Sequence, residues 1–320
     1  MAKRVLIIAS GGGHTGFAAA LAQRLQGKAE MLFIIPKGDQ WSRMKIEPFG
    51  EVVEVTKGRG PKDPLWLFAA RLIKASFESF VKVPSKFEVI VSTGSNHSIM
   101  PALAGKLKGM KLVNIESGDR FVKPGRAVRV LTPFSDLIAL QWPEQLRILP
   151  KGKVFGPIVE YPEYEPYDGG YILVAAGTYG HRPLVEAVNE INWERVVMQI
   201  GPLSPEEYRR RHPSWTVFQF DPDFGRWLAG AKVVISHPSK TVIDAAVAYR
   251  KPVVIAPNPE WRLAAGVEDG RILAEKLNGV LVEEITPQNL TDAVEKVAER
   301  KPPEYPDGAQ KLAEEILRRL

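Results

Sequence analysis

The 320-residue sequence contains no cysteine, which excludes disulfide bridges, zinc–thiolate sites and thiol nucleophiles. It also has no apolar run near the roughly 20 residues that span a bilayer. The first apolar segment meets glycines at 11–13, too early for a secretory signal. We therefore expect a cytoplasmic protein that touches a membrane at most peripherally.

Acidic residues are fewer than basic ones, 37 against 43, so the formal net charge is +6. This balance suits nucleic acid, anionic lipid or a phosphorylated substrate, and it is equally typical of a solvated basic surface. Apolar residues make up 45% of the chain, enough for a sizeable core. The length is comfortable for two domains of about 150 residues each.

Short runs rich in valine, isoleucine and leucine alternate with helical patterns along the whole chain. The predicted strands are 4–10, 31–36, 51–55, 87–93, 111–117, 136–142, 153–156, 171–176, 195–201, 215–220, 231–236, 251–257 and 279–283. They are nearly continuously apolar, as in parallel sheets with both faces buried. The predicted fold class is therefore α/β, with two doubly wound parallel sheets.

A proline-rich stretch that ends in two glycines, residues 157–170, separates the two halves. The predicted organisation is a first domain over 1–158, a linker over 159–170 and a second domain over 171–305. A C-terminal helix over 306–320 follows, which we expect to pack back on the first domain. Ligands of doubly wound sheets bind outside the carboxyl ends of the strands, so the site is expected in a cleft between the domains.

The first strand-end loop is "SGGGHTG", residues 10–16, which matches the dinucleotide-binding pattern G-x-G-x-x-G. NAD binding also needs an acidic residue at the end of the second strand, but that strand ends in Pro36 and Lys37. The first acidic residue after it, Asp39, comes too late in the sequence to take that position. What remains is a loop that lets a ligand approach the backbone and a helix N-terminus that suits an anion. His14 is either a general base or a capping or core histidine.

Two further loops of the first half carry polar groups. His97, in the loop 91–98, opens a helix and is interpreted as a cap or packing residue. Glu116 ends the strand before "SGDRF", and its carboxylate is either a base or hydroxyl acceptor, or one half of an ion pair with Arg120.

In the second half, the stretch 235–246 is the most informative. Ser239 or Thr241 can cap a helix whose N-terminus, helped by Lys240, would hold a diphosphate. Asp244 lies one turn further and can accept both hydroxyls of a ribose. The alternative is an ordinary capped helix with a solvated aspartate.

Other features of the second half are weaker. The loop 175–182 repeats the strand, glycine turn and helix pattern. The "DPD" of residues 221–223 superficially matches a metal-binding Asp-x-Asp, but Pro222 favours a turn before a helix, so no metal is expected.

Several segments together resemble one family. "LIIASGGGHTG", "VSTGSNHSIMPALAGKLKGMKLVNIES" and "SDLIALQWPE" resemble the acceptor-side subunit of the two-subunit UDP-N-acetylglucosamine transferase of dolichol-linked oligosaccharide synthesis. "ILVAAGT", "VVMQIG", "AKVVISHPSKTVIDAA" and "ILAEKL" resemble its donor-side subunit. The layout is also similar to the peptidoglycan lipid II synthase and to bacterial exopolysaccharide transferases. The resemblance implies a GT-B fold, two Rossmann-like domains facing across a cleft, with no required metal or cofactor.

The resemblance also implies roles for individual residues. His14 and Glu116 match residues near the reaction centre, and are the first and second candidates for the catalytic base. The implied acceptor-binding residues are Gly12, Gly13, Thr15, Ser117 and Arg120; the implied donor-binding residues are Gly177, Thr178, Gly201, Ser239, Lys240, Thr241, Asp244 and Arg271. The family's Asn-His-Gln, whose glutamine reads the sugar, appears here as Asp269-Gly270-Arg271. Because an arginine favours a carboxylate, the donor is expected to carry either GlcNAc or a uronic acid.

The implied function is inverting transfer of a sugar from a UDP-sugar to a polyprenyl or dolichyl diphosphate-linked sugar, in N-glycan or cell-surface polysaccharide precursor synthesis. The stretch 63–83 is basic and aromatic: Trp66, Ala70, Ile73, Phe77 and Phe80 fall on one stripe. It predicts either a helix on the inner face of the cell membrane or a core helix with a solvated edge. No nucleic-acid partner is expected. The alternatives are a UDP-sugar 2-epimerase of the same fold, an NAD-dependent dehydrogenase and a non-catalytic nucleotide-sugar binding module.

Overall fold

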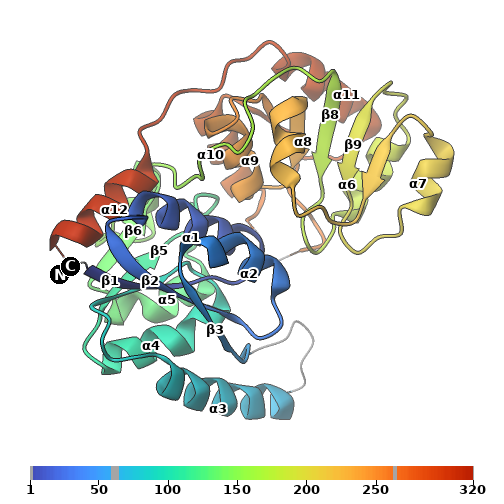
Figure 1. Cartoon of the computed structure of the whole chain (residues 1–320). Helices are drawn as coiled ribbons and strands as arrows, with labels where there is room; N and C mark the ends of the chain where they lie inside the picture. The colour runs from blue at the N-terminus through green and yellow to red at the C-terminus, as the bar shows by residue number, and fades with distance from the viewer. Residues whose placement is uncertain (1–2, 59–64, 262–264, 320) are drawn as a thin grey trace. The chain divides into compact units, whose positions relative to one another are not determined.

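The computed structural model describes residues 3–58, 65–261 and 265–319. The chain forms two compact units, one of residues 1–160 with 306–320 and one of residues 161–305. Each unit is built on one sheet of parallel strands, seven in the first and six in the second. The predicted fold class is thereby confirmed (Figure 1).

The sheet of the first unit has the order β3-β2-β1-β4-β5-β6-β7. Its strands are β1 Lys3–Ile8, β2 Ala29–Pro36, β3 Glu51–Val55, β4 Val89–Ser92, β5 Lys111–Ile115, β6 Leu137–Leu140 and β7 Lys153–Val154. Its helices are α1 Gly12–Leu25, α2 Gln40–Ile46, α3 Leu65–Lys82, α4 Ile99–Leu107, α5 Arg126–Leu131 and α12 Gly308–Arg319, with short 3₁₀ turns η1 Glu47–Phe49, η2 Asn96–Ser98, η3 Thr132–Phe134 and η4 Pro143–Arg147.

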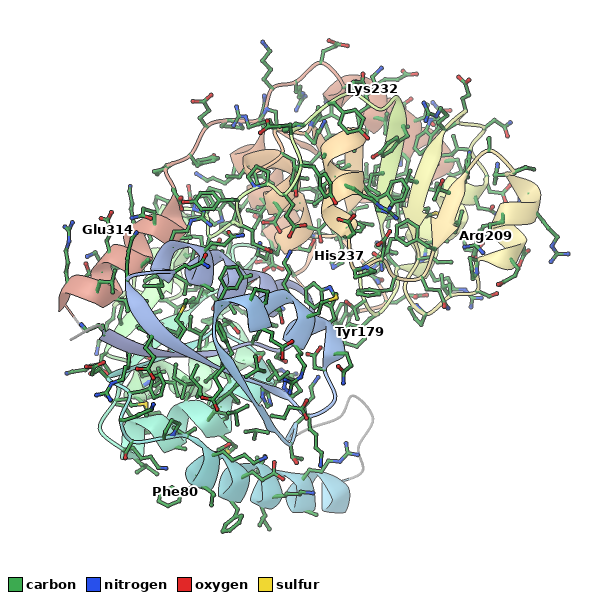
Figure 2. All side chains as sticks on the ribbon, in the orientation of Figure 1. Phe80, Tyr179, Arg209, Lys232, His237 and Glu314 are labelled. Atoms are coloured by element: carbon green, nitrogen blue, oxygen red, sulfur yellow. The ribbon has the colours of Figure 1, made fainter. Side chains whose placement is uncertain are left out.

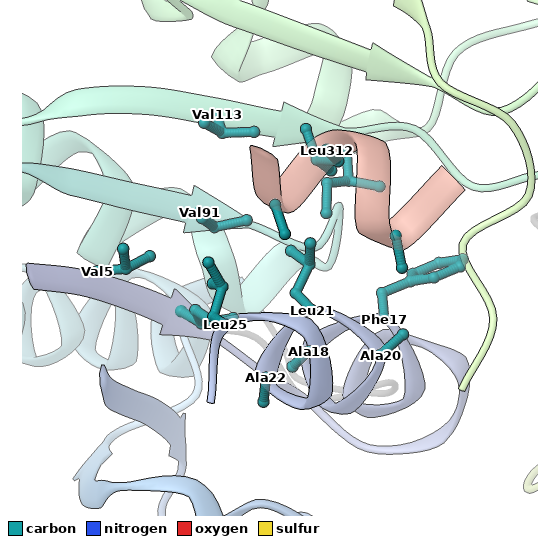
Figure 3. Packing of buried hydrophobic residues seen from close by; sticks show 14 of the residues in the cluster. Val5, Phe17, Ala18, Ala20, Leu21, Ala22, Leu25, Val91, Val113 and Leu312 are labelled. Carbon is teal, nitrogen blue, oxygen red and sulfur yellow. The ribbon is translucent and has the colours of Figure 1, made fainter. Parts of the chain in front are cut away.

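Both faces of this sheet are buried, which explains the continuously apolar strand sequences. Along β1, Val5 and Ile7 pack with α1 and α12, whereas Leu6 and Ile8 pack on the opposite face with residues of α4. The C-terminal helix α12 therefore belongs to the first unit, where Leu312 lies over α1 and the sheet (Figure 3). A partly buried ion pair between Arg24 and Asp307, 3.1 Å long, joins α1 to the start of α12.

The sheet of the second unit has the order β10-β9-β8-β11-β12-β13. Its strands are β8 Tyr171–Ala175, β9 Val196–Gln199, β10 Thr216–Phe218, β11 Ala231–Ser236, β12 Val253–Ile255 and β13 Val280–Leu281. Its helices are α6 Arg182–Asn189, α7 Glu206–Arg211, α8 Phe224–Gly230, α9 Lys240–Val247, α10 Val267–Leu277 and α11 Pro287–Val297. Residues of α6, α7 and α11 form one hydrophobic core with the strands.

The element that differs most from the sequence prediction is α1. The stretch 10–16 was predicted to be a loop with a helix from residue 15, but α1 already begins at Gly12. The turn from β1 into α1 uses positive φ angles at Gly11 (57°) and Gly12 (49°), a conformation in which glycine has no steric penalty. His14 therefore lies in the first turn of a helix and not in a loop. No helix within the described ranges is long and apolar enough to cross a membrane.

Candidate functional site

His14 is held at the carboxyl edge of the first sheet by one strong hydrogen bond. Its Nδ1 lies 2.7 Å from the carbonyl oxygen of Thr93, which follows β4. Because a carbonyl can only accept, Nδ1 carries the proton and the neutral ring has its lone pair on Nε2. Burial lowers the pKa of His14 below its usual 6.5, so the ring is neutral at pH 7. A neutral, oriented imidazole is the form that a general base requires.

Glu116, directly after β5, is almost fully buried. Its two carboxyl oxygens accept hydrogen bonds from the backbone amides of Ser117 (2.8 Å) and Gly125 (2.9 Å). Burial raises the pKa of Glu116 to about 7, and these two amides oppose the rise. The carboxyl group is thus engaged by two backbone amides of its own loop. The geometry favours Glu116 as the organiser of the loop 117–125.

Side chains from outside the loop 117–125 also hold it in place. Gln145 donates through its side-chain amide to the carbonyls of Ser117 and Arg120, and Trp142 donates to the carbonyl of Gly118. The Ser117 hydroxyl donates to Asp119. Asp119 and Arg120 contribute electrostatically to the pKa shifts of both His14 and Glu116. The structure therefore brings the predicted residues His14, Glu116, Ser117 and Arg120 into one neighbourhood.

Thr15 does not join this group. It is fully buried, and its Oγ1 lies 2.6 Å from Oγ of Ser42 in α2. Ser42 in turn donates to Asp39, whose carboxylate also caps α2 by accepting from the Ser42 amide. The Thr15 hydroxyl thus has a partner inside the unit, and its predicted contact with the acceptor stays a prediction. Gly12 and Gly13, in contrast, are exposed at the start of α1.

Two glycines that sequence reasoning did not single out shape the same edge. At Gly94 (φ +85°), a Cβ would lie 2.8 Å from the carbonyl oxygen of Ile115 and 3.9 Å from Cε1 of His14. At Gly125, a Cβ would lie 3.2 Å from a carboxyl oxygen of Glu116. A larger residue at 94 would collide with backbone, so glycine there lets the β4 and β5 loops close around His14. Their contact partners lie far away in sequence, which is why the pattern alone did not reveal them.

His97 lies in the same loop region, after β4. Its side chain is buried and only 3% exposed, and burial lowers its pKa to about 4. The structure therefore places it as a packing residue on this edge.

The carboxyl edge of the second sheet is formed by the loops after β8, β9 and β11. The predicted donor-binding glycines Gly177 (φ +75°) and Gly201 (φ +64°) have positive φ angles. A Cβ at 177 would lie 2.7 Å from Cε1 of His237, and a Cβ at 201 would lie 2.6 Å from the carbonyl oxygen of Gly177. These glycines allow the strand-end loops to pack against each other. Thr178, next to Gly177, is exposed.

Helix α9 begins at this edge, directly after Ser239. Ser239 occupies the N-cap position, but its hydroxyl makes no capping hydrogen bond, contrary to the prediction. Its Oγ is buried, and within the ranges that the structure describes it has no hydrogen-bond partner. A buried hydroxyl without a partner costs free energy, and an incoming acceptor group would remove that cost. Thr241, also predicted to bind the donor, is half-buried in the first turn of α9.

Lys240 and Asp244 differ from the prediction, which gave each a separate ligand group. They pair with each other along α9: Nζ of Lys240 lies 2.5 and 2.7 Å from the two carboxylate oxygens of Asp244. The Lys240 side chain is 5% exposed and that of Asp244 19%. The i,i+4 spacing explains the pair, since both side chains lie on one face of the helix.

Arg271, a further predicted donor-binding residue, lies in α10 and forms two ion pairs. It pairs with Glu268 (3.2 Å) within α10 and with Glu283 (2.7 Å) after β13. The carboxyl of Asp269 accepts from the Gly266 amide at the start of α10. Arg271 thus contacts two carboxylates of the protein itself, and its contact with the carboxylate of a uronic acid stays a prediction.

The "DPD" stretch forms a turn before α8, as its proline predicted. Asp221 accepts hydrogen bonds from Arg226 (2.6 Å) and Trp227 (2.8 Å), and Asp223 accepts from Tyr164 (2.8 Å). In the part of the chain that the structure describes, no three histidine or acidic side chains gather as metal ligands would.

The two parallel-sheet units define the class: this is the GT-B architecture. The chain is 26% identical over 283 residues to the UDP-N-acetylglucosamine–N-acetylmuramyl-(pentapeptide) pyrophosphoryl-undecaprenol N-acetylglucosamine transferase of Prochlorococcus marinus, covering 80% of this chain and 76% of that protein. A transferase of the same name from Rippkaea orientalis is 25% identical over 313 residues, covering 91% of this chain and 88% of that protein. No protein-family model matches the chain.

Solved structures agree on the fold. MurG of Acinetobacter baumannii superposes with a TM-score of 0.63 at 16% identity, covering 98% of this chain and 95% of that one. A UDP-N-acetylglucosamine 2-epimerase of Rickettsia bellii gives a TM-score of 0.66 at 12% identity, covering 99% and 96%. The sequence relatives are named as transferases to an undecaprenol-linked acceptor, and the resemblance to dolichol-pathway subunits stays a prediction.

Proposed function

We propose that this protein is an inverting glycosyltransferase that moves a sugar from a UDP-sugar to a polyprenyl or dolichyl diphosphate-linked sugar. The relatives named as UDP-GlcNAc transferases support this reaction class over most of both chains. The observation that carries the proposal is the oriented, neutral His14, whose Nδ1–H bond to Thr93 leaves Nε2 as a proton acceptor.

In the proposed reaction, His14 Nε2 takes the proton of the acceptor hydroxyl as its oxygen attacks the anomeric carbon of the donor. The bond from that carbon to the diphosphate breaks, and UDP leaves with the bonding electron pair. A single displacement of this kind inverts the anomeric configuration. Glu116 holds the loop beside His14 through the Ser117 and Gly125 amides.

The second unit is proposed to bind the donor. The amides at the N-terminus of α9, the Ser239 hydroxyl and Lys240 stabilise the leaving diphosphate, with no metal ion needed. Asp244 accepts the ribose hydroxyls. The Lys240 ammonium contacts the Asp244 carboxylate, so the two side chains that are proposed to bind the diphosphate and the ribose lie next to each other.

The acceptor is proposed to be a lipid because one face of α3 is apolar and exposed. This apolar face of α3 consists of Ile73, Phe77, Phe80 and Val81, with exposed fractions between 55% and 73%. Phe80 projects away from the first unit (Figure 2). Lys74 and Lys82 lie on the same helix. An exposed apolar face with basic neighbours suits the surface of an anionic membrane, and we propose peripheral binding at the inner face of the cell membrane.

The stripe predicted from sequence is only partly visible. Ala70, Ile73, Phe77 and Phe80 are exposed, whereas the side chain of Trp66 lies outside the described residues. The opposite side of α3 is buried at Ala75 and Ser79. The helix therefore has one packed face and one exposed apolar face.

Ligand-induced stabilisation tests the donor assignment. Thermal unfolding is measured with UDP, UDP-GlcNAc, UDP-glucuronic acid and NAD. The proposal expects UDP and a UDP-sugar to raise the melting temperature, since a ligand that binds only the folded state stabilises it. Stabilisation by NAD alone would overturn the proposal and favour a dehydrogenase.

A further inference from the structure

A cluster of aromatic rings lies at the carboxyl edge of the second sheet. Tyr179 and Trp261 meet edge to face with ring centroids 4.9 Å apart, and Trp261 lies 6.4 Å from the ring of His237. His237 is in turn 6.4 Å from His181. These residues come from the loops after β8, β11 and β12, which are adjacent strands. Asn258 ties two of the loops together by donating to the carbonyl of Gly180 (3.3 Å).

The cluster is uncharged and partly open to solvent. Tyr179 is 56% exposed, and His237 and Trp261 are half-buried. Burial lowers the pKa of both His181 and His237 to about 4, so both rings are neutral at pH 7. Aromatic rings that are partly open to solvent suit a ligand that has an apolar side as well as polar groups. The C–H face of a pyranose ring has this character.

The cluster borders the proposed diphosphate position. His237 precedes Ser239 by two residues, and its ring packs on the backbone of Gly177, beside the exposed Thr178 and Tyr179. Tyr179 and His237 lie toward the same end of the second unit, away from Lys232 at the amino end of β11 (Figure 2). A sugar joined to a diphosphate at the N-terminus of α9 would therefore lie within reach of these rings.

We propose that Tyr179, His237 and Trp261 form an aromatic platform on which the sugar ring of the donor stacks. This inference rests on the proposed function and names how its sugar is recognised. The polar groups at the start of α10 are engaged within the protein, Asp269 with the Gly266 amide and Arg271 with two glutamates. Recognition accordingly depends on the apolar face of the sugar more than on hydrogen bonds to its hydroxyls.

The test compares UDP with UDP-GlcNAc by calorimetric titration of the full chain. Trp261→Ala should weaken UDP-GlcNAc binding about 10-fold, because an aromatic contact of this size is lost, and should leave UDP binding within about 2-fold. Trp261→Phe should retain most of the affinity, and Tyr179→Ala should show a smaller loss. Tyr161→Ala, at a tyrosine of similar exposure (51%) outside the cluster, is the matched control.

The outcomes separate this inference from the proposed function. If the unsubstituted protein binds no UDP, the proposed function fails. If it binds UDP but Trp261→Ala and Tyr179→Ala leave the ratio of the two affinities unchanged, the aromatic platform is refuted while the donor site stands. Should Trp261→Ala not fold, Trp261→Phe and Tyr179→Ala still measure that ratio.

Discussion

The carboxyl edges of the two sheets are built on the same pattern of strand, glycine turn and helix. They differ in the side chains that they carry. The first edge carries two titratable groups fixed by backbone: His14 by the Thr93 carbonyl and Glu116 by two amides. The second edge carries neutral rings and an ion pair at the start of α9. The first arrangement suits proton transfer, whereas the second suits an anionic nucleotide and its sugar.

The pKa directions make the same distinction. At the first edge, burial raises the pKa of Glu116 to about 7, so this carboxyl group titrates near neutrality, and burial lowers the pKa of His14 below its usual 6.5. At the second edge, His181 and His237 have pKa values of about 4 and do not titrate near pH 7. The carboxyl group that titrates near neutrality therefore lies at the first edge.

The largest effect is expected from His14→Ala. Loss of the general base should lower kcat by about 10²- to 10⁴-fold, while UDP binding in the second unit stays unchanged. His212→Ala is the matched control, because His212 is also half-buried and also bonds a backbone carbonyl, that of Asn189 (2.9 Å). Steady-state kinetics measures kcat, and a titration with UDP measures nucleotide binding. Near-normal turnover of the His14→Ala enzyme would show that His14 is not the general base.

The second-largest effect is expected on UDP binding, when the Lys240–Asp244 ion pair of α9 is changed. Lys240→Met should weaken UDP binding about 10- to 100-fold, since charge-assisted contacts to the diphosphate are lost. Asp244→Asn should weaken both UDP and uridine, because it removes a ribose acceptor. Lys232→Met, at an exposed lysine at the amino end of β11, serves as control. Unaltered UDP affinity in both α9 variants would place the nucleotide elsewhere.

Changes to the apolar face of α3 are expected to alter membrane binding by a comparable or smaller factor. Phe77→Ser with Phe80→Ser should reduce binding to anionic vesicles at least about 10-fold, because each buried phenylalanine contributes roughly 1.5–3 kcal/mol. Vesicle flotation measures this, and Tyr167→Ser, at an exposed tyrosine of the second unit, is the control. Equal flotation of the double variant and the unsubstituted protein would assign this face another role.

The smallest expected effect is on the pH dependence of kcat/KM, which separates His14 from Glu116 as the candidate base. With His14 as base, kcat/KM should fall by no more than about 2-fold between pH 7.5 and 6.5, since the lowered pKa keeps the imidazole neutral. Glu116 as base, with a pKa of about 7, would give about a 3-fold fall over the same interval. An acidic limb centred near pH 7 that disappears in Glu116→Gln would reverse the assignment.

The fold could be predicted from sequence because buried parallel strands are continuously apolar, as β1 and β11 show. The start of α1 could not, because three successive glycines are typical of a loop, and only the positive φ angles of Gly11 and Gly12 show a turn directly into a helix. The i,i+4 spacing in the sequence placed Lys240 and Asp244 on one face of a helix. It did not show that the two side chains bind each other.

Contacts between distant residues explain the other differences. Arg271 was assigned to the donor from the family resemblance, and local sequence did not show that it also pairs with Glu283, 12 residues away and beyond β13. Thr15 was assigned to the acceptor from the family resemblance, and its contact with Ser42 of α2 is a tertiary one that no local pattern shows. The rings of Tyr179, His237 and Trp261 gather only when three strand-end loops meet, and no local pattern predicts such a cluster.

The central claim is transfer of the sugar to a lipid acceptor, and a labelled-donor assay tests it most directly. The protein is incubated with UDP-GlcNAc labelled in the sugar, with and without a polyprenyl diphosphate-linked sugar, and both the lipid phase and the nucleotide sugars are analysed. The account predicts label in the lipid phase, with an equal amount of UDP, only when the acceptor is present. An epimerised UDP-sugar formed without acceptor, and no labelled lipid with it, would contradict it.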